Sequence, residues 1–294
     1  MASTNAPRLA AGIIASVLML AGCAPDSSSP TNADRAARVS LARAGYDQAG
    51  AHRQYGPAIK VGDGMARSYV VVDSKQGGAP LELGVALDAQ ALDGLPRDMM
   101  MYMYILKLPA LAPAPYQFIE LDWNPMGHEP PNVYTVPHFD FHFYTMSLAE
   151  HNSIVPSDPD FAAKANNVPT GGYVPAFFVP LAGPGGTPAD VAVPQMGVHW
   201  SDVRSPELQG LLGHPENVEP FTKTFIYGSW NGRFTFYEPM ITVDYLRTRP
   251  DVTTPIPVPA LYPQSGYFPT AYKVTYDAQA REYRVALSGL TARP

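Results

Sequence analysis

The residues whose types could do chemistry are concentrated at positions 136–144, which read Val-Pro-His-Phe-Asp-Phe-His-Phe-Tyr. Side chains alternate between the two faces of a β-strand, so this stretch predicts one face of three phenylalanines and one polar face. The polar face consists of His138, Asp140, His142 and Tyr144. Two imidazoles with a carboxylate between them are typical of metal ligands or of a proton-transfer group.

Two later segments place polar side chains among apolar neighbours. His199 stands between Val198 and Trp200, and Glu238 shares one face of a predicted strand with two phenylalanines. A carboxylate on an aromatic face is costly unless it is paired or bound to a cation. We therefore predict a site for a divalent metal, with zinc favoured and manganese or iron as the alternatives. The predicted ligands are His138, His142, His199 and Glu238.

A metal ion bound at this site would make a catalytic reaction possible. Metal-bound water loses a proton near neutral pH, which supports a hydrolase or lyase reaction with Asp140 or Glu238 as the base. Residues predicted to support the ligands from behind are His128, Glu120, Asp122 and Tyr144. For the two acids of segment 116–123, a solvated sheet face is the favoured interpretation. Glu150 is interpreted as a helix cap and His151 as a surface residue.

The spacing of the two strand histidines limits what one ion can bind. In a straight strand His138 and His142 lie about 13 Å apart, too far for both imidazoles to reach one ion. Either the strand bends near Pro137, or only one pair that includes Asp140 ligates while the third residue supports it. The alternative without a metal is a buried polar network that fixes strand register in a non-catalytic protein that binds a ligand or partner.

The loop before the central stretch is a further candidate for the site. Residues 124–131 are rich in proline and polar groups and contain His128. The loop joins two predicted strands, so it is able to fold back over the second of them. We expect His128 to approach the central strand in this way.

The elements that position these residues are predicted to be β-strands. The chain has 294 residues and 32 prolines and lacks long segments with the apolar period of a helix. This pattern predicts an all-β fold, a single β-sandwich or distorted β-barrel domain over residues 34–294 with short peripheral helices. The predicted strands cover residues 67–72, 81–87, 99–108, 116–123, 136–144, 225–240 with a turn at Asn231-Gly232, 272–276 and 283–287.

Three other segments have predicted structures of their own. The methionines of segment 99–108 are interpreted as part of a core strand. Short helices are predicted over residues 33–44 and, after a capping box, from Leu148 to about Ile154. Residues 168–194 are rich in proline and glycine and are interpreted as a long connector between strands.

The first residues carry the pattern of an export signal. Residues 9–21 form an apolar run too short for a comfortable membrane span, and Leu20-Ala21-Gly22-Cys23 matches a bacterial lipobox. We therefore predict a lipoprotein signal peptide over residues 1–22, a lipidated Cys23 and a flexible lipid-anchored tether over residues 23–33. The predicted location is the cell envelope.

Composition restricts the partners. Cys23 is the only cysteine, so no disulfide can form within one chain. Ala24 stands where an inner-membrane signal would place Asp, which favours the outer membrane in a bacterium that has two. The net charge of −6 and the absence of a basic cluster exclude nucleic acid as a partner. The predicted partners are the membrane, through Cys23, and a small-molecule ligand.

Several motifs together resemble a family of uncharacterised exported bacterial and archaeal proteins that share a domain of unknown function. The resemblance spans nearly the whole chain after the signal peptide and implies a single mostly-β domain, without naming a reaction. A weaker likeness to cupins rests on His and Glu ligands from strands, although the cupin His-x-His pair is replaced by His138-x-Asp140-x-His142. The motifs that resemble the uncharacterised family are residues 61–70, 92–96, 123–131, 137–144, 196–200 and 237–240.

Overall fold

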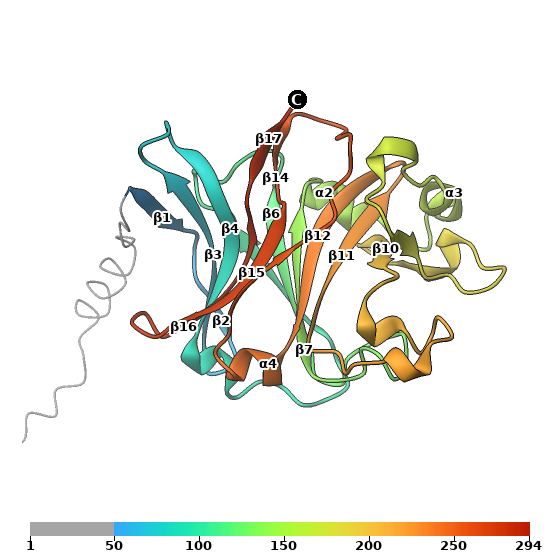
Figure 1. Cartoon of the computed structure of the whole chain (residues 1–294), viewed down its shortest axis with the longest axis horizontal. Helices are drawn as coiled ribbons and strands as arrows, with labels where there is room; N and C mark the ends of the chain where they lie inside the picture. Colours follow the sequence, from blue (N-terminus) through green and yellow to red (C-terminus); the bar gives the residue numbers. More distant parts are fainter. Residues whose placement is uncertain (1–49) are drawn as a thin grey trace, which may run out of the picture. The chain divides into compact units, whose positions relative to one another are not determined.

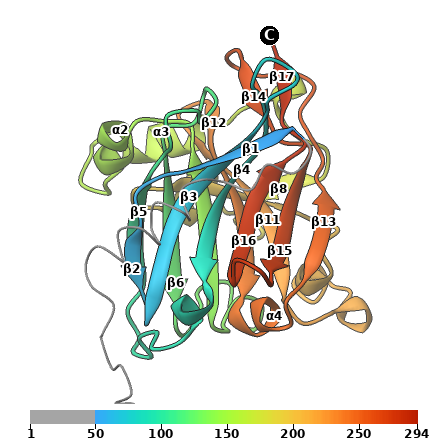
Figure 2. The same ribbon diagram turned by 90° about the vertical axis from the view of Figure 1, so that its left-hand side faces the viewer.

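The computed structural model describes residues 50–294, which form two large antiparallel β-sheets (Figure 1). In the first sheet the strands follow the order β1-β3-β4-β16-β15-β13, and β2 pairs with β3. Figure 2 turns this sheet toward the viewer. Its strands are β1 (Ala51–Tyr55), β2 (Ile59–Val61), β3 (Gly64–Asp73), β4 (Ala79–Asp88), β13 (Asp251–Pro255), β15 (Ala271–Asp277) and β16 (Glu282–Ser288).

The second sheet carries the candidate site. Its strands follow the order β5-β6-β7-β12-β11-β10-β8, and β9 pairs with β10. These strands are β5 (Tyr102–Lys107), β6 (Phe118–Asn124), β7 (His138–Tyr144), β8 (Phe178–Pro180), β9 (Ala192–Val193), β10 (Gly197–Asp202), β11 (Lys223–Trp230) and β12 (Arg233–Thr242). A separate small pair joins β14 (Gly266–Phe268) and β17 (Thr291–Arg293).

Helices are short and lie outside the sheets. The α-helices are α2 (Leu148–Ser153), α3 (Phe161–Asn166) and α4 (Val243–Arg247). The 3-10 helices are η1 (Ala89–Leu92), η2 (Gly171–Tyr173), η3 (Pro188–Val191), η4 (Pro206–Leu208) and η5 (Pro215–Asn217). Within residues 50–294, no helix has both the length and the apolar character needed to span a bilayer.

The main hydrophobic core lies between the two large sheets. Val85 and Val285 of the first sheet belong to the same buried cluster as Phe139, Phe141 and Phe143 of β7. The phenylalanine face of β7 therefore points into the sandwich, as the alternation predicts. Both sheets are open, with different strands at their two edges, so of the two predicted architectures the sandwich is the one observed.

The opposite face of the second sheet, called here the outer face, is also buried over β6 and β7. A second apolar cluster covers part of it and joins loop residues Val133, Tyr134 and Phe221 to Ile226 of β11 and Met240 of β12. Elsewhere α2 lies over it, where the ring of His151 contacts that of Tyr144 at a centroid distance of 4.9 Å. All seven side chains of β7 are consequently buried, including the polar ones.

Most predicted strands and the predicted turn at Asn231-Gly232 are confirmed. The Asn231-Gly232 turn joins β11 to β12, and both residues have the positive φ angles, 46° and 87°, of a type I′ turn. The helix predicted after Ser147 is α2, whose first turn Ser147 caps by accepting a hydrogen bond from the backbone N–H of Glu150. The predicted connector 168–194 contributes β8, which pairs with β10.

The prediction of a methionine-rich core strand is wrong. β5 begins only at Tyr102 and lies at an edge of the second sheet. Met99 is 90% exposed, and Met100, Met101 and Met103 are exposed as well. Met99, Met100 and Met101 precede the strand, and Met103 lies on the outer face at the edge of the sheet, where it remains exposed. The predicted helix at 33–44, the signal peptide at 1–22, Cys23 and the tether at 23–33 lie outside the described residues.

A charge network stabilises the outer side of the first sheet. The carboxylate of Glu282 pairs with Arg67 and, at 2.8 Å, with Arg284 Nη2, and it accepts a hydrogen bond from Tyr55 Oη at 3.0 Å. Burial alone raises the pKa of Glu282, but the two guanidinium groups outweigh burial and hold that pKa below its ordinary value. The carboxylate is therefore ionised and compensated at neutral pH.

We expect Glu282→Gln to lower the free energy of unfolding by about 3 kcal/mol at pH 7, because Arg67 loses its carboxylate partner and Arg284 keeps only Asp277 within the described chain. A carboxylate whose pKa is depressed in the fold stabilises it above the unfolded pKa and loses that effect as pH falls through the folded pKa. The difference between parent and variant should therefore shrink below pH 4.5, the ordinary value for this group. Urea unfolding at pH 7 and pH 3 measures it, and an equal difference at both pH values would contradict the argument.

Candidate metal centre

The outer face of the second sheet holds a layer of titratable side chains, called here the polar layer. It contains five of the chain's seven histidines. Each carboxylate in it is at most 3% exposed and lies within ion-pair distance of an imidazole. Among residues 50–294, none of these carboxylates forms an ion pair with Lys or Arg. The layer consists of Glu120, Asp122, His128, His138, Asp140, His142, His151, His199 and Glu238.

The register between neighbouring strands places members of the polar layer opposite one another. Across β6 and β7, Glu120 stands opposite His142, and Asp122 stands opposite Asp140. Glu238 lies on β12, the other neighbour of β7, and its carboxylate reaches the His142 ring. Because alternate residues share a face, the same pleat that buries the phenylalanines of β7 in the sandwich points its polar residues outward.

The absence of a side chain at Gly228 allows His199 to reach the polar layer across β11. Gly228 pairs with His199 on one side and Phe236 on the other. A Cβ atom at this glycine would lie 1.9 Å from ring carbons of Phe236, so the ring occupies the space that a side chain would fill. The Phe236 ring contacts those of His142 and His199, with centroid distances of 5.0 and 5.2 Å. A bare backbone position in β11 thus leaves room for a ring that packs against both imidazoles.

One group within the layer, called here the His142 cluster, consists of His142, His199 and Glu238. The distance from His142 Nε2 to Glu238 Oε1 is 3.3 Å, and that from His199 Nε2 to Glu238 Oε2 is 3.6 Å. Behind this cluster, Asp122 Oδ2 lies 3.4 Å from His142 Nδ1. The His199 side chain is 24% exposed, whereas that of Glu238 is buried, so solvent reaches the cluster beside His199.

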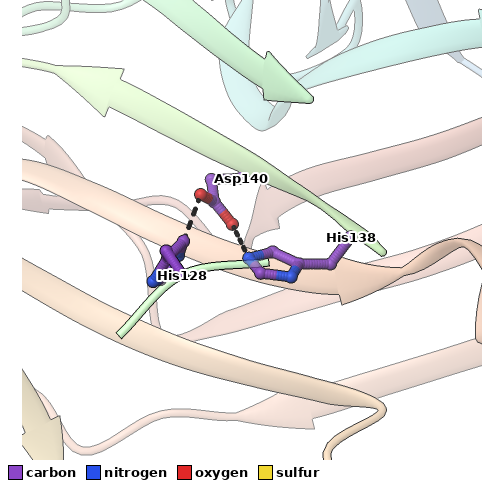
Figure 3. Close-up of side chains that lie close together, drawn as sticks. All are labelled: His128, His138 and Asp140. Carbon is purple, nitrogen blue, oxygen red and sulfur yellow. Dashed lines mark ion pairs between the residues drawn. The ribbon is translucent and has the colours of Figure 1, made fainter. Parts of the chain in front are cut away.

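A second group, the His138 cluster, consists of His128, His138 and Asp140 (Figure 3). His138 Nε2 lies 3.1 Å from Asp140 Oδ1, and His128 Nε2 lies 3.3 Å from Asp140 Oδ2. Asn124 Nδ2 donates a hydrogen bond of 2.7 Å to the same carboxylate. The proline-rich loop has folded His128 over the central strand, as expected from its position in the sequence.

The four predicted ligands do not converge on one ion. The structure brings His142, His199 and Glu238 together, but it places His138 with Asp140 and His128. The cause is the strand spacing, because residues four apart in an extended strand cannot share an ion. His128, predicted to act behind the ligands, is a full member of a cluster. The pairing of His138 with Asp140 is one of the two arrangements that the spacing left open.

Three side chains, Glu120, Asp122 and His151, are buried although they were predicted to be exposed. Glu120 and Asp122 were expected on a solvated face, which is wrong, because both are buried under the cover of the outer face. His151 was expected at the surface, which is also wrong, since it is buried with its Nε2 at 3.3 Å from Glu120 Oε2. Within α2, His151 is the buried residue, and Ile154, which follows the helix as its C-cap, is buried as well. Tyr144 is buried between Phe118 and the His142 ring.

Burial sets the protonation of the His142 cluster. Burial lowers the pKa of His142 to about 3 and that of His199 to about 4, so both imidazoles are neutral at physiological pH. Burial, reinforced by neighbouring carboxylates, raises the pKa of Glu238 and of Asp122 well above the ordinary range. For Asp140, burial also raises the pKa, but His138 and His128 outweigh burial and lower it. A neutral imidazole with a free lone pair is the form that binds a metal.

Buried polar atoms without a hydrogen-bond partner are concentrated in the layer. In the described part of the chain they include both ring nitrogens of His142, both carboxylate oxygens of Asp122, and Glu238 Oε2. Native structures seldom leave such atoms unpaired, and unpaired groups in a native protein often mark a functional site. By contrast, two surface hollows of about 280 and 420 Å³ are lined by no member of the layer. Donor chemistry, and not the size of a cavity, marks this site.

Comparison with known proteins gives one family similarity. Residues 76–123 match the model of the TTHB210-like family, whose description is "Hypothetical protein TTHB210". The match supports the predicted resemblance to an uncharacterised family, but it ends before β7 and shows neither the motif at 137–144 nor the cupin likeness. Within the polar layer it includes only Glu120 and Asp122. Neither the curated proteins nor the solved structures gave a significant match.

Proposed function

We propose that this is an exported, lipid-anchored protein whose β-domain binds a divalent metal ion through His142, His199 and Glu238. The observation that carries the proposal is the buried Glu238 carboxylate, which faces two imidazole Nε2 atoms and has no Lys or Arg partner in the described chain. A cation at this point would compensate the carboxylate and use both lone pairs. Two imidazoles and one carboxylate form a known ligand set of zinc and also suit iron or manganese.

The spacing of the donor atoms supports this proposal. Ligand atoms at 2.1 Å from a tetrahedral zinc ion lie about 3.4 Å from one another. The two nitrogen-to-oxygen distances in the His142 cluster are 3.3 and 3.6 Å, and all of its ligand atoms lie within 4.8 Å of one another. Little movement is therefore needed to close the three side chains around an ion.

Asp122 supports the same ion from behind. Its carboxylate lies against His142 Nδ1, so an N–H at Nδ1 would face an acceptor and leave the Nε2 lone pair toward Glu238. Metal-binding histidines commonly donate their other N–H to a carboxylate in this way, which fixes the tautomer and the ring orientation.

We expect elemental analysis of the full chain loaded with zinc to show that His142→Ala and His199→Ala each bind one ion fewer than the parent. Asp122→Asn should retain the ion with an affinity about 10- to 100-fold weaker, measured by calorimetry. His214→Ala is the matched control, since this imidazole is exposed and lies outside the polar layer. A parent chain that binds no divalent ion under any loading condition would leave the non-catalytic polar network as the explanation.

A hydrolase or lyase activity is the second candidate function, favoured by the exposure of His199. Three protein ligands leave a coordination position for water, and a bound metal lowers the pKa of that water toward 7. Of the two predicted bases, Glu238 belongs to the His142 cluster, whereas the oxygens of Asp140 face His128 and His138.

Hydrolysis of activated ester and phosphoester substrates tests the catalytic candidate. We expect the zinc-loaded parent and His214→Ala to be equally active, and His199→Ala to lose the activity together with its ion. Activity that persists in His199→Ala would assign the reaction to another site or to a contaminant. A zinc-loaded parent without activity would restrict the function to binding.

Export and anchoring form the other part of the proposal, supported by the apolar run 9–21 and the sequence Leu20-Ala21-Gly22-Cys23. In a bacterial host we expect the parent to incorporate radiolabelled palmitate and to sediment with membranes. Cys23→Ala should do neither, because the thiol that accepts the lipid is gone. Ser28→Ala, a change within the tether, serves as the control. Equal membrane fractionation of parent and Cys23→Ala would contradict the anchor.

A further inference from the structure

We propose that His128, His138 and Asp140 bind a second, separate divalent ion, and that this ion fastens the loop of residues 125–137 to β7. This site does not depend on the ion proposed at Glu238, because the two share no ligand. His138 and Asp140 are fixed on the strand, and His128 comes from the loop. The proposal therefore assigns two ions to each chain, one that solvent reaches beside His199 and one that holds a loop.

Backbone carbonyls fix the orientation of both imidazoles. His138 Nδ1 lies 2.6 Å from Val136 O, and His128 Nδ1 lies 2.7 Å from Glu129 O. A carbonyl oxygen only accepts hydrogen bonds, so each Nδ1 carries the proton and donates it. In the neutral rings both Nε2 atoms consequently bear lone pairs. This is the arrangement by which histidine ligands of metals are held in place.

Both lone pairs face one carboxylate. His138 Nε2 and Asp140 Oδ1 are 3.1 Å apart, yet neither atom has a hydrogen-bond partner among residues 50–294. A proton shared by the two atoms would lie close to the line between them, whereas an ion sits at the apex of a triangle with its two ligands. Close approach without hydrogen-bond alignment therefore favours an ion. A buried lone pair opposite a carboxylate oxygen is otherwise repulsive and uncompensated.

The distances and the surrounding contacts fit the same ion. The nitrogen-to-oxygen distances of 3.1 and 3.3 Å are close to the value of about 3.4 Å for ligands of tetrahedral zinc. Asn124 donates to the second oxygen of Asp140 and so holds the carboxylate in place. Figure 3 shows each ring facing a different oxygen of this carboxylate, and the two rings contact each other at a centroid distance of 4.7 Å. Each of the three ligands is thus held by a hydrogen bond to a residue other than the ligands.

The loop has few other means of fixing its position. The single cysteine of the chain is Cys23, so no disulfide within one chain can close this loop. The loop is also held by a backbone hydrogen bond that Val243 N–H donates to Pro137 O and by apolar packing: Tyr134 packs edge-on against Phe221, which also covers the His138 ring at a centroid distance of 5.3 Å. An ion that joins His128 to β7 would add a bond between loop and sheet, and structural zinc sites contribute directly to folding energy.

Zinc stoichiometry of the full chain, stripped with chelator and titrated by calorimetry with elemental analysis, tests the second site. We expect two ions in the parent and in His214→Ala, one in His128→Ala, one in His199→Ala, and none when His128→Ala and His199→Ala are combined. His128 is the preferred variant because its ring is partly exposed, so its loss leaves the buried strand intact. His138→Gln should also retain one ion.

The two proposed sites fail in different ways. A parent with one ion that is lost in His199→Ala and kept in His128→Ala would overturn the second site and leave the proposed function standing. The reverse pattern would overturn the proposed function and support this site. A parent without any ion would overturn both.

Hydrogen exchange of residues 125–137 tests the role of the ion. If loop opening releases the ion, zinc at 100 times its Kd should slow exchange of this loop about 100-fold in the parent and in His199→Ala. In His128→Ala zinc should have no effect on it. Protection that is unchanged by zinc in the parent would show that protons hold the cluster, and it would overturn the proposal.

Discussion

Four buried carboxylates impose the main electrostatic constraint on this structure. Their ionisable neighbours in the described chain are imidazoles, and none of the four forms an ion pair with Lys or Arg there. Burying a charge costs several kcal/mol unless a partner compensates it. Imidazoles compensate only when they are protonated, and burial lowers the pKa of His142 and His199. Around Glu238 the layer must therefore hold protons on its acids or a cation between its donors. Donor positions around Glu238 and around Asp140 are among those that fit a cation.

The two sheets solve the same problem in different ways. On the first sheet the buried Glu282 is compensated by Arg67 and Arg284, whose charges are permanent, and its pKa is lowered. On the second sheet Glu238 has imidazole neighbours, and its pKa is raised. Because a guanidinium stays charged, it compensates a carboxylate without a further proton or metal ion. An imidazole leaves a lone pair for a metal, and this difference separates a structural charge network from a candidate binding site.

Much of the fold was predictable from local pattern. The alternation in β7 predicted the phenylalanine face, and the Asn231-Gly232 dipeptide predicted the hairpin of β11 and β12, because both depend on backbone geometry over a few residues. The errors concern burial. Met99 is exposed because it precedes β5 and lies outside the sheet, and Glu120 and His151 are buried because α2 covers part of the outer face. The sequence of a strand does not show whether the strand has one neighbouring strand or two, or which element covers its face.

For the site, the sequence by itself determined the donor types, their common face on β7, and the distance that keeps His138 and His142 from sharing one ion in a straight strand. Only the tertiary structure decided the partners. Strand pairing placed Glu238 beside His142, and the proline-rich loop brought in His128. The absence of a side chain at Gly228 left room for the Phe236 ring, which packs against His142 and His199. The physical reason is that periodicity fixes the direction of a side chain, whereas convergence depends on contacts between residues far apart in the chain.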